Sequence, residues 1–197
     1  MESVFTYFDQ FLVLSPEAKK LVLKCVDLVK IEANTEILVS GSTNNFMYII
    51  KKGVVRGYYT YSDHEETISL WMEYDTFGDV STYIANRPAI KSYQSIEGIE
   101  VYRVNIVQFR RLFATNHEIC NLGRIIAEQF IVKTEFFKDN IMRCAAEEKY
   151  RFFIQNKPGL IDRVKLKHIA SFLKITPETL SRIRKTANYE QRVDGCI

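Results

Sequence analysis

Residues 164–185, VKLKHIASFLKITPETLSRIRK, have the pattern of two short helices joined by a tight turn, the helix-turn-helix pattern. Apolar residues of the first helix recur at i, i+3, i+4 and i+7: Leu166, Ile169, Ala170 and Leu173. Such a stripe must pack against another element. Lys165, Lys167 and His168 fall off the stripe, and we expect these three side chains to face solvent.

Thr176 and Pro177 mark the start of the second helix. Threonine is a favoured N-cap, and proline is tolerated at the first helical position because its missing N–H would have no partner there. Ile175 and Leu180 flank this cap as a hydrophobic staple does. The turn carries Lys174 where glycine is common, and a residue with a side chain at φ > 0 costs about 1 kcal/mol.

The outer face of the second helix is polar and charged. Its residues recur at three- and four-residue spacings, opposite the apolar Leu180 and Ile183. They are Glu178, Ser181, Arg182 and Lys185. A Glu near a helix N-terminus accepts from cytosine N4, and an Arg one turn later donates to guanine O6 and N7, so this face is suited to a major groove. Side chains predicted to contact phosphates are Lys165, Lys167, Thr176, Thr179 and Lys185. The alternative is a helical hairpin whose polar face is only solvated.

The length and composition of the chain fit one large domain, or one medium domain joined to a small one. Its 197 residues are 47% hydrophobic, which is enough to bury real cores. No stretch approaches the roughly 18 uninterrupted apolar residues of a membrane span. The first residues, MESVFTYFDQF, lack the basic segment of a secretion signal. We therefore expect a cytoplasmic protein that does not engage membranes.

Positive charge is concentrated near the C-terminal end. The formal net charge is +3, but residues 160–197 hold eight Lys/Arg against four Asp/Glu, a surplus of four positive charges. This surplus coincides with the predicted helix-turn-helix, where binding to phosphates would require it.

The four cysteines have no metal-site or disulfide pattern. Cys25, Cys120, Cys144 and Cys196 are scattered without C-x-x-C spacing. A disulfide framework, a zinc ribbon or an iron–sulfur cluster is therefore not predicted, and we expect no metal site. Free thiols are the simpler interpretation.

Alternating and apolar runs between residues 35 and 106 predict an antiparallel β-domain, a sandwich or roll. The runs are Glu36–Val39, Met47–Ile50, Val54–Tyr61, Thr67–Trp71, Tyr93–Ile96 and Glu100–Val104. Turn-forming segments such as KKG, SDH and FGD separate them. Before this domain, residues 15–29 start with a Ser–Pro pair and continue at helical spacing, which predicts an N-terminal helix.

Residues 116–147 predict one long helix, since they contain no proline and a single glycine. A helix of 30 residues is about 45 Å long, which exceeds a small domain. One side is expected to pack on the β-domain and another to pair with the helix of a second copy. The residues predicted for that second surface are Ile119, Leu122, Ile126, Phe130 and Phe137. The alternative is a helix buried wholly within its own chain. Residues 156–163, NKPGLIDR, then predict a linker or short hairpin.

The order of a β-roll, a long helix and a C-terminal helix-turn-helix resembles the Crp/Fnr family of bacterial regulators over nearly the whole chain. The most specific part is E-x-x-S-R at Glu178, Ser181 and Arg182, the form associated with FNR-like site recognition. In the β-domain, GSTNNFMYIIKKG ends at Gly53 and FGD stands at residues 77–79, as in the family.

The resemblance implies an α+β fold. An N-terminal antiparallel β-roll, jelly-roll-like as in cyclic-nucleotide-binding domains, would have flanking helices and lead into a long dimerisation helix and a winged helix-turn-helix. The implied parts are an effector-sensing roll over residues 1–115, a dimerisation helix over 116–147 and a DNA-binding domain over 148–197.

By the same resemblance, the chain would act as a homodimer on double-stranded DNA. It would read a palindromic operator with half-sites about one helical turn apart. Glu178, Ser181 and Arg182 would read the bases, and RNA polymerase would be a further partner.

The effector site departs from the family's usual pattern. The family uses a Gly-Glu pair for the ribose and an Arg-Ser pair for the cyclic phosphate, and this chain has Gly78, Asp79, Lys91 and Ser92. Asp79 is one methylene shorter than Glu, and Lys91 lacks the planar fork with which Arg grips two oxygens. We therefore do not expect cyclic AMP as the effector, and the identity of the ligand stays open. No N-terminal cysteine cluster supports iron–sulfur sensing, and the isolated His64, His117 and His168 do not favour haem.

Two other classes of function compete with a regulator. An effector-binding module that acts through protein partners, without DNA readout, predicts a neutral outer face on the second helix. A metal-dependent β-sandwich oxygenase needs clustered His and carboxylates, but only His64 lies in the strand region. The charged face and the basic C-terminal segment favour a sequence-specific transcription regulator that is not an enzyme.

Overall fold

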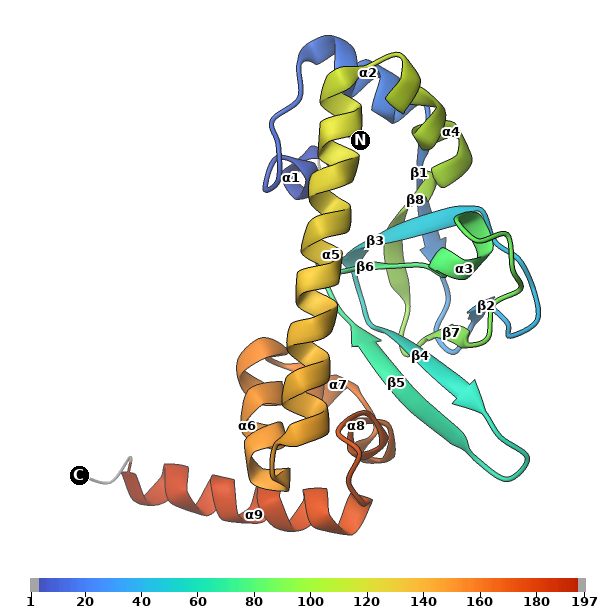
Figure 1. Cartoon of the computed structure of the whole chain (residues 1–197). Coiled ribbons are helices and arrows are strands. Elements are labelled where there is room, and N and C mark those ends of the chain that lie inside the picture. Colours follow the sequence, from blue (N-terminus) through green and yellow to red (C-terminus); the bar gives the residue numbers. More distant parts are fainter. Residues whose placement is uncertain (1–3, 195–197) are drawn as a thin grey trace.

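The computed structural model describes residues 4–194, which form a β-roll, a long helix and a group of C-terminal helices (Figure 1). The strands are β1 (Val26–Ile31), β2 (Glu36–Leu38), β3 (Phe46–Lys52), β4 (Val55–Thr60), β5 (Glu65–Trp71), β6 (Thr76–Phe77), β7 (Ser92–Ser95) and β8 (Ile99–Asn105). They form two antiparallel sheets, with strand orders β1-β8-β3-β6 and β2-β7-β4-β5. The predicted antiparallel β-domain is confirmed.

Helices precede and follow the roll. They are α1 (Val4–Phe8), α2 (Pro16–Leu23), α3 (Val80–Tyr83), α4 (Ile106–Arg111), α5 (His117–Arg143), α6 (Ala146–Asn156), α7 (Leu160–Arg163), α8 (Leu166–Phe172) and α9 (Pro177–Asp194), with a 3₁₀ turn η1 (Leu112–Ala114). The N-terminal helices pack beside the upper half of α5, and the C-terminal helices surround its lower half (Figure 1). Helix α5 therefore links the two ends of the molecule.

Aromatic rings fill the interior of the roll. Tyr48 and Phe77 stack with their ring centroids 4.8 Å apart, and Trp71 stacks on Tyr93 at 5.6 Å. Phe77 also stacks on Tyr93, at 6.0 Å. Offset stacking of this kind adds to the burial of large apolar rings. The two sheets are thus joined by a packed aromatic core.

The predicted N-terminal helix over residues 15–29 is correct only in its first half. Ser15 caps α2 as expected, since its Oγ accepts a hydrogen bond from the Ala18 N–H at 3.3 Å. The helix ends at Leu23, and Val26 and Val29 lie instead in β1, which pairs with β8. Valines at these positions match a helical period, but pairing with β8 gives the backbone a full ladder of hydrogen bonds that outweighs this weak local preference.

The predicted long helix over residues 116–147 is α5 followed by a break. Asn116 caps α5, since its side chain accepts from the Ile119 N–H at 3.0 Å. The helix ends at Arg143, and Glu148 reaches back to the Ala145 N–H at 2.9 Å to start α6. The predicted linker over residues 156–163 contains Gly159, at φ +78°, and the short helix α7.

The helix-turn-helix consists of α8 and α9. Its turn holds Lys174 at φ +55°, the left-handed conformation expected there. The tail beyond Lys185 continues α9 as far as Asp194. The resemblance also implied a wing, but every strand within residues 4–194 belongs to one of the two sheets of the roll, so no wing hairpin accompanies the helix-turn-helix in this part of the chain.

Candidate DNA interface and ligand cavity

The outer side of α9 presents one continuous polar surface. It is formed by Pro177, Glu178, Ser181, Arg182 and Lys185. Glu178, Arg182 and Lys185 are exposed and Ser181 is half-buried, whereas Leu180 and Ile183 on the other side are buried. The structure therefore brings together the residues that the sequence placed on one face, which we call the recognition face (residues 177, 178, 181, 182 and 185).

The first turn of α9 is held by its cap. The Thr176 Oγ accepts a hydrogen bond from the Thr179 N–H at 3.2 Å, and the two threonine hydroxyls lie 3.1 Å apart. Thr176 thus satisfies one of the backbone donors that a helix leaves open at its start. Lys165 and Lys167, which precede and begin α8, are exposed as predicted.

His168 is not exposed, contrary to the expectation from the sequence. Its Nδ1 accepts a hydrogen bond from the Arg56 guanidinium at 3.2 Å and lies 3.3 Å from the Thr67 Oγ. Burial, aided by the positive charge of Arg56, lowers the pKa of His168 to about 4. The helical spacing did place this side chain off the apolar stripe of α8, but the roll covers that side of the helix.

The roll and the helix-turn-helix share a polar seam along β5. The Thr67 N–H donates to the Ser171 Oγ at 2.8 Å. Arg163 forms a two-point ion pair with Glu73, at 2.8 and 2.9 Å, and also contacts Glu97. The hydrogen bonds from Arg163 lower the pKa of Glu73 to about 2.

Two lysines of the C-terminal helices extend this seam. Lys157 pairs with Asp75, and Lys174 in the helix-turn-helix turn pairs with Glu66. Beneath these contacts, Val54 and Leu70 of the roll join one hydrophobic cluster with residues of α6, α8 and α9. The recognition face is therefore attached to a domain that is itself fixed to the roll.

The predicted effector residues are close together, but several are already engaged. Asp79 is buried, caps α3 by accepting from the Ser81 N–H at 3.0 Å, and accepts from the Tyr93 hydroxyl at 3.4 Å. The Gly78 carbonyl accepts from the same hydroxyl at 3.1 Å. The buried Ser92 Oγ accepts from the Ser40 N–H at 3.0 Å. The ammonium group of Lys91, the fourth of these residues, lies 5.4 Å from the centre of the Tyr93 ring.

The predicted dimer surface of α5 is largely turned toward its own chain. Ile119 and Leu122 are fully buried in the cluster formed with the N-terminal helices, and Ile126 packs against that cluster. Phe130 and Phe137 line a cavity within the chain. Ile119 and Leu122 are therefore not free to contact a second copy, whereas Phe130 is 45% exposed, and a dimer contact through Ile126, Phe130 and Phe137 stays a prediction.

That cavity, which we call the junction cavity, lies where the roll, α5 and the C-terminal helices meet. Its volume is about 370 Å³. Residues 68–71 of β5, residues 74–76 and Lys91 line it from the roll, and Lys157, Phe172 and Lys174 line it from the C-terminal helices. No local sequence pattern indicates this cavity, because its lining residues come from segments more than 60 positions apart. The one hint was the mixture of lysines with aromatic residues in the second half of α5.

No group of three or more His, Cys, Asp or Glu positioned to hold a metal ion occurs within the part of the chain that the structure describes. Cys25, Cys120 and Cys144 are free thiols, and Cys196 lies outside the described residues. His64 contacts the neighbouring Asp63 at 2.7 Å. Among the described helices, none is long and apolar enough to cross a membrane.

Taken together, the roll with its short α3 is joined by the long helix to a C-terminal helix-turn-helix. Residues 28–116 match the Cyclic nucleotide-binding domain family. No curated protein sequence matches the chain.

Several solved structures share this architecture. FixK2 from Bradyrhizobium japonicum has a TM-score of 0.71 at 16% identity, with 84% of this chain and 86% of that chain covered. CLP from Xanthomonas campestris, a c-di-GMP responsive global regulator, has a TM-score of 0.64 at 11% identity, with 90% and 93% covered. A CooA variant from Carboxydothermus hydrogenoformans has a TM-score of 0.59 at 17% identity, with 86% and 79% covered. The chain has the fold of the Crp/Fnr regulators.

Proposed function

We propose that this protein is a homodimeric, sequence-specific DNA-binding transcription regulator whose roll senses a ligand other than cyclic AMP. The observation that carries this proposal is the recognition face. It places Glu178, Ser181 and Arg182 side by side on the exposed side of a helix whose other side is buried.

Each residue of the recognition face has a chemical role in the proposal. Glu178 accepts from a cytosine amino group, Arg182 donates to guanine O6 and N7, and Ser181 donates to or accepts from a neighbouring base. Lys165, Lys167 and Lys185 supply the charge for phosphates, which positions the helix without reading sequence. Thr176 and Thr179 lie at the start of α9, where backbone N–H groups and hydroxyls also favour a phosphate.

The dimer is proposed to form through a different stripe of α5 from the one that the sequence suggested. Ile125, Val132 and Phe136 recur at spacings of seven and four residues and therefore share one side of the helix. Val132 and Phe136 are 62% and 52% exposed, and Ile131 beside them is 61% exposed. Pairing of this stripe with its two-fold copy would cover these side chains and bring two recognition faces onto a palindromic operator.

The engaged state of the effector residues supports a ligand other than cyclic AMP. Asp79 and Ser92 already bind groups of their own chain, since Asp79 accepts from the Tyr93 hydroxyl and Ser92 accepts from the Ser40 N–H. Lys91 offers a point charge in place of a fork for a cyclic phosphate. The proposed setting is the bacterial cytoplasm, with RNA polymerase as the partner that reads the bound regulator.

The test is selection of binding sites from randomised duplex DNA with the purified protein, with and without cyclic AMP. We expect a palindromic consensus that cyclic AMP does not change. Arg182→Ala should lose the consensus, whereas Arg111→Ala, an exposed arginine of α4, should keep it. Absence of any consensus for the unaltered protein would instead favour an effector module that acts through protein partners.

A further inference from the structure

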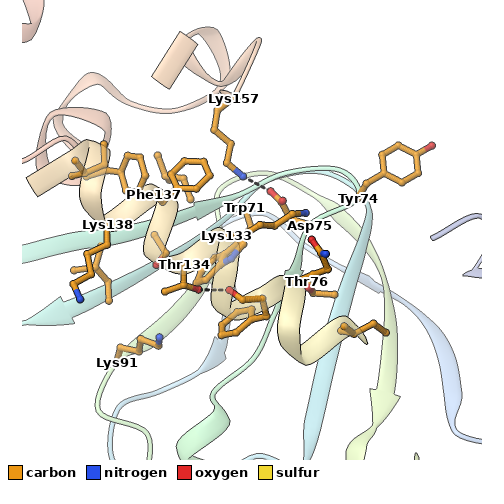
Figure 2. Close-up of a pocket in the computed structure, with 18 of the residues that line it drawn as sticks. Trp71, Tyr74, Asp75, Thr76, Lys91, Lys133, Thr134, Phe137, Lys138 and Lys157 are labelled. Atoms are coloured by element: carbon orange, nitrogen blue, oxygen red, sulfur yellow. Dashed lines mark hydrogen bonds and ion pairs between the residues drawn. The ribbon is translucent and has the colours of Figure 1, made fainter. Parts of the chain in front are cut away.

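The junction cavity is lined by separate parts of the chain (Figure 2). Trp71 and residues 74–76 come from the roll, Lys133, Thr134, Phe137 and Lys138 come from α5, and Lys157 is the residue that follows α6. Phe172 and Lys174 of the helix-turn-helix complete it. A volume of about 370 Å³ is within the range of small-molecule sites.

Positive charge dominates the polar part of this lining. Five lysines contribute to it, namely Lys91, Lys133, Lys138, Lys157 and Lys174, whereas Asp75 is the only carboxylate among the lining residues described. Lys157 is paired with Asp75 and Lys174 with Glu66. Lys138 lies 3.5 Å from Glu135 in the same helix.

Two of these lysines are not part of an ion pair. Neither Lys91 nor Lys133 forms an ion pair within the described part of the chain. Lys91 is half-buried, and its burial lowers its pKa. A half-buried ammonium group without an ion pair is costly, and although the Tyr93 ring and the charge of Asp79 partly compensate Lys91, a bound anion would offset more of that cost.

The rest of the lining is apolar and largely aromatic. Trp71, Phe130, Phe137 and Phe172 contribute rings, and Leu70 and Ile141 contribute aliphatic side chains. An apolar wall with a few charged groups is typical of a pocket that buries the body of a ligand and fixes one polar end.

We propose that the junction cavity binds a small amphipathic anion, with its acidic group held by Lys91 and Lys133 and its apolar body against the aromatic wall. As the effector site of a regulator, this assignment rests on the DNA-binding function proposed above. As a binding site, it stands on the cavity alone.

Such a ligand would act on the seam between the two domains. It would lie beside the Lys157–Asp75 pair and against Phe172 and Lys174 of the helix-turn-helix. The free energy of ligand binding would therefore depend on the position of α9 relative to the roll. Such a dependence is the condition for coupling ligand binding to DNA affinity.

The chain contains one tryptophan, Trp71, and that residue lines the cavity, so its fluorescence reports directly on occupancy. Three probes with the same ten-carbon chain would be titrated into the full-length protein without DNA: decanoate, decyl phosphate and decan-1-ol. We expect saturable changes in fluorescence, with at least one anion binding tenfold or more tightly than the alcohol. The two anionic arms separate a carboxylate site from a phosphate site.

The variant that tests the charge is Lys91→Gln combined with Lys133→Gln. We expect it to weaken binding of the preferred anion about tenfold while leaving the affinity for decan-1-ol unchanged, and the alcohol thereby reports that the cavity is still folded. Lys30→Gln with Lys52→Gln, two exposed lysines of the roll, is the matched control.

Equal affinity for alcohol and anions, unchanged anion binding in the Lys91/Lys133 variant, or no saturable binding of any probe would each overturn the proposal. None of these results depends on DNA. If the protein binds decanoate but selects no operator, the binding site stands and the proposed DNA-binding function is excluded. If the protein selects an operator but binds no probe, only the binding site is excluded.

Discussion

The helix-turn-helix has two polar sides, and its charges behave differently on each. On the side toward the roll, Arg163, His168 and Lys174 all have partners in β5, in the loops next to it or in β4. On the recognition face, Arg182 and Lys185 are exposed, and neither forms an ion pair with a side chain of residues 4–186. Both sides contribute to the same basic segment, so net charge alone does not separate charges that hold the domain from charges that are available for a ligand.

The largest effect on stability is expected from the buried side chains of α9, which lie between the recognition face and the side toward the roll. Leu180 is fully buried beneath the recognition face. Leu180→Ala removes apolar contacts and leaves a cavity, so it should lower the free energy of unfolding by about 2–5 kcal/mol. Chemical denaturation followed by circular dichroism measures this loss. A loss below about 1 kcal/mol would show that α9 is not packed on α8 as described.

A DNA-specific effect is expected at Arg182. Arg182→Ala should leave the free energy of unfolding within about 0.5 kcal/mol but weaken binding to a selected operator by about 1–3 kcal/mol, roughly 5- to 150-fold. Fluorescence anisotropy with a labelled operator measures it. Arg184 is the control, because it lies on another side of α9, 4.0 Å from the exposed Asp162, and Arg184→Ala should change operator affinity far less.

The side toward the roll should respond to acid through His168. Its pKa is about 4 in the folded protein and about 6.5 when unfolded, so the unfolded chain binds the extra proton between these values. The contribution of neutral His168 is complete above pH 6.5 and is lost as the pH falls toward 4. Allowing for solvent screening, this loss is about 1–2 kcal/mol.

The measurement is the thermal midpoint from pH 7.5 to 4 for the unaltered protein and for His168→Gln. The variant should lose less stability across this interval, even if it starts lower at neutral pH. Parallel curves would show that folding does not lower the pKa of His168.

The smallest effect is expected at the cap of α9. Thr176→Ala removes the acceptor for the Thr179 N–H and should cost about 1 kcal/mol of stability. Thr176→Ser keeps the hydroxyl and should restore most of the loss. Thermal melting of the two variants side by side tests this, and equal losses would exclude the hydrogen bond as the cause.

Local patterns in the sequence were sufficient for the parts of the fold that local chemistry decides. The helical period and the Thr-Pro start were sufficient to predict α8 and α9, and short alternating runs predicted most strands of the roll. Strand β1 was missed because Val22, Val26 and Val29 also match a helical spacing. A strand that pairs with β8, about 70 residues later, leaves no local signal of that pairing.

The candidate site also contains residues that could be predicted from the sequence and residues that could not. The recognition face could be predicted because all its residues lie within one helix. The partners of His168 and Arg163 could not, since Arg56 and Glu73 are about 90 or more residues away. The burial of Ile119 and Leu122 in α5 could not be predicted for a related reason. The sequence shows which of its residues are apolar, but not which side of the helix the rest of the chain will cover.

Helix α5 also acts as a lever. Its 27 residues span about 40 Å, from the N-terminal helices to the C-terminal ones (Figure 1). Near its first turns, the ring of Phe113 would lie 2.5 Å from a Cβ built on Gly123, so a bulkier residue there would force this end to tilt. A tilt of only about 5° displaces the far end by roughly 3.5 Å, which is close to the rise of one base pair. In the proposed complex with DNA, such a tilt would displace the recognition face by about one base-pair step.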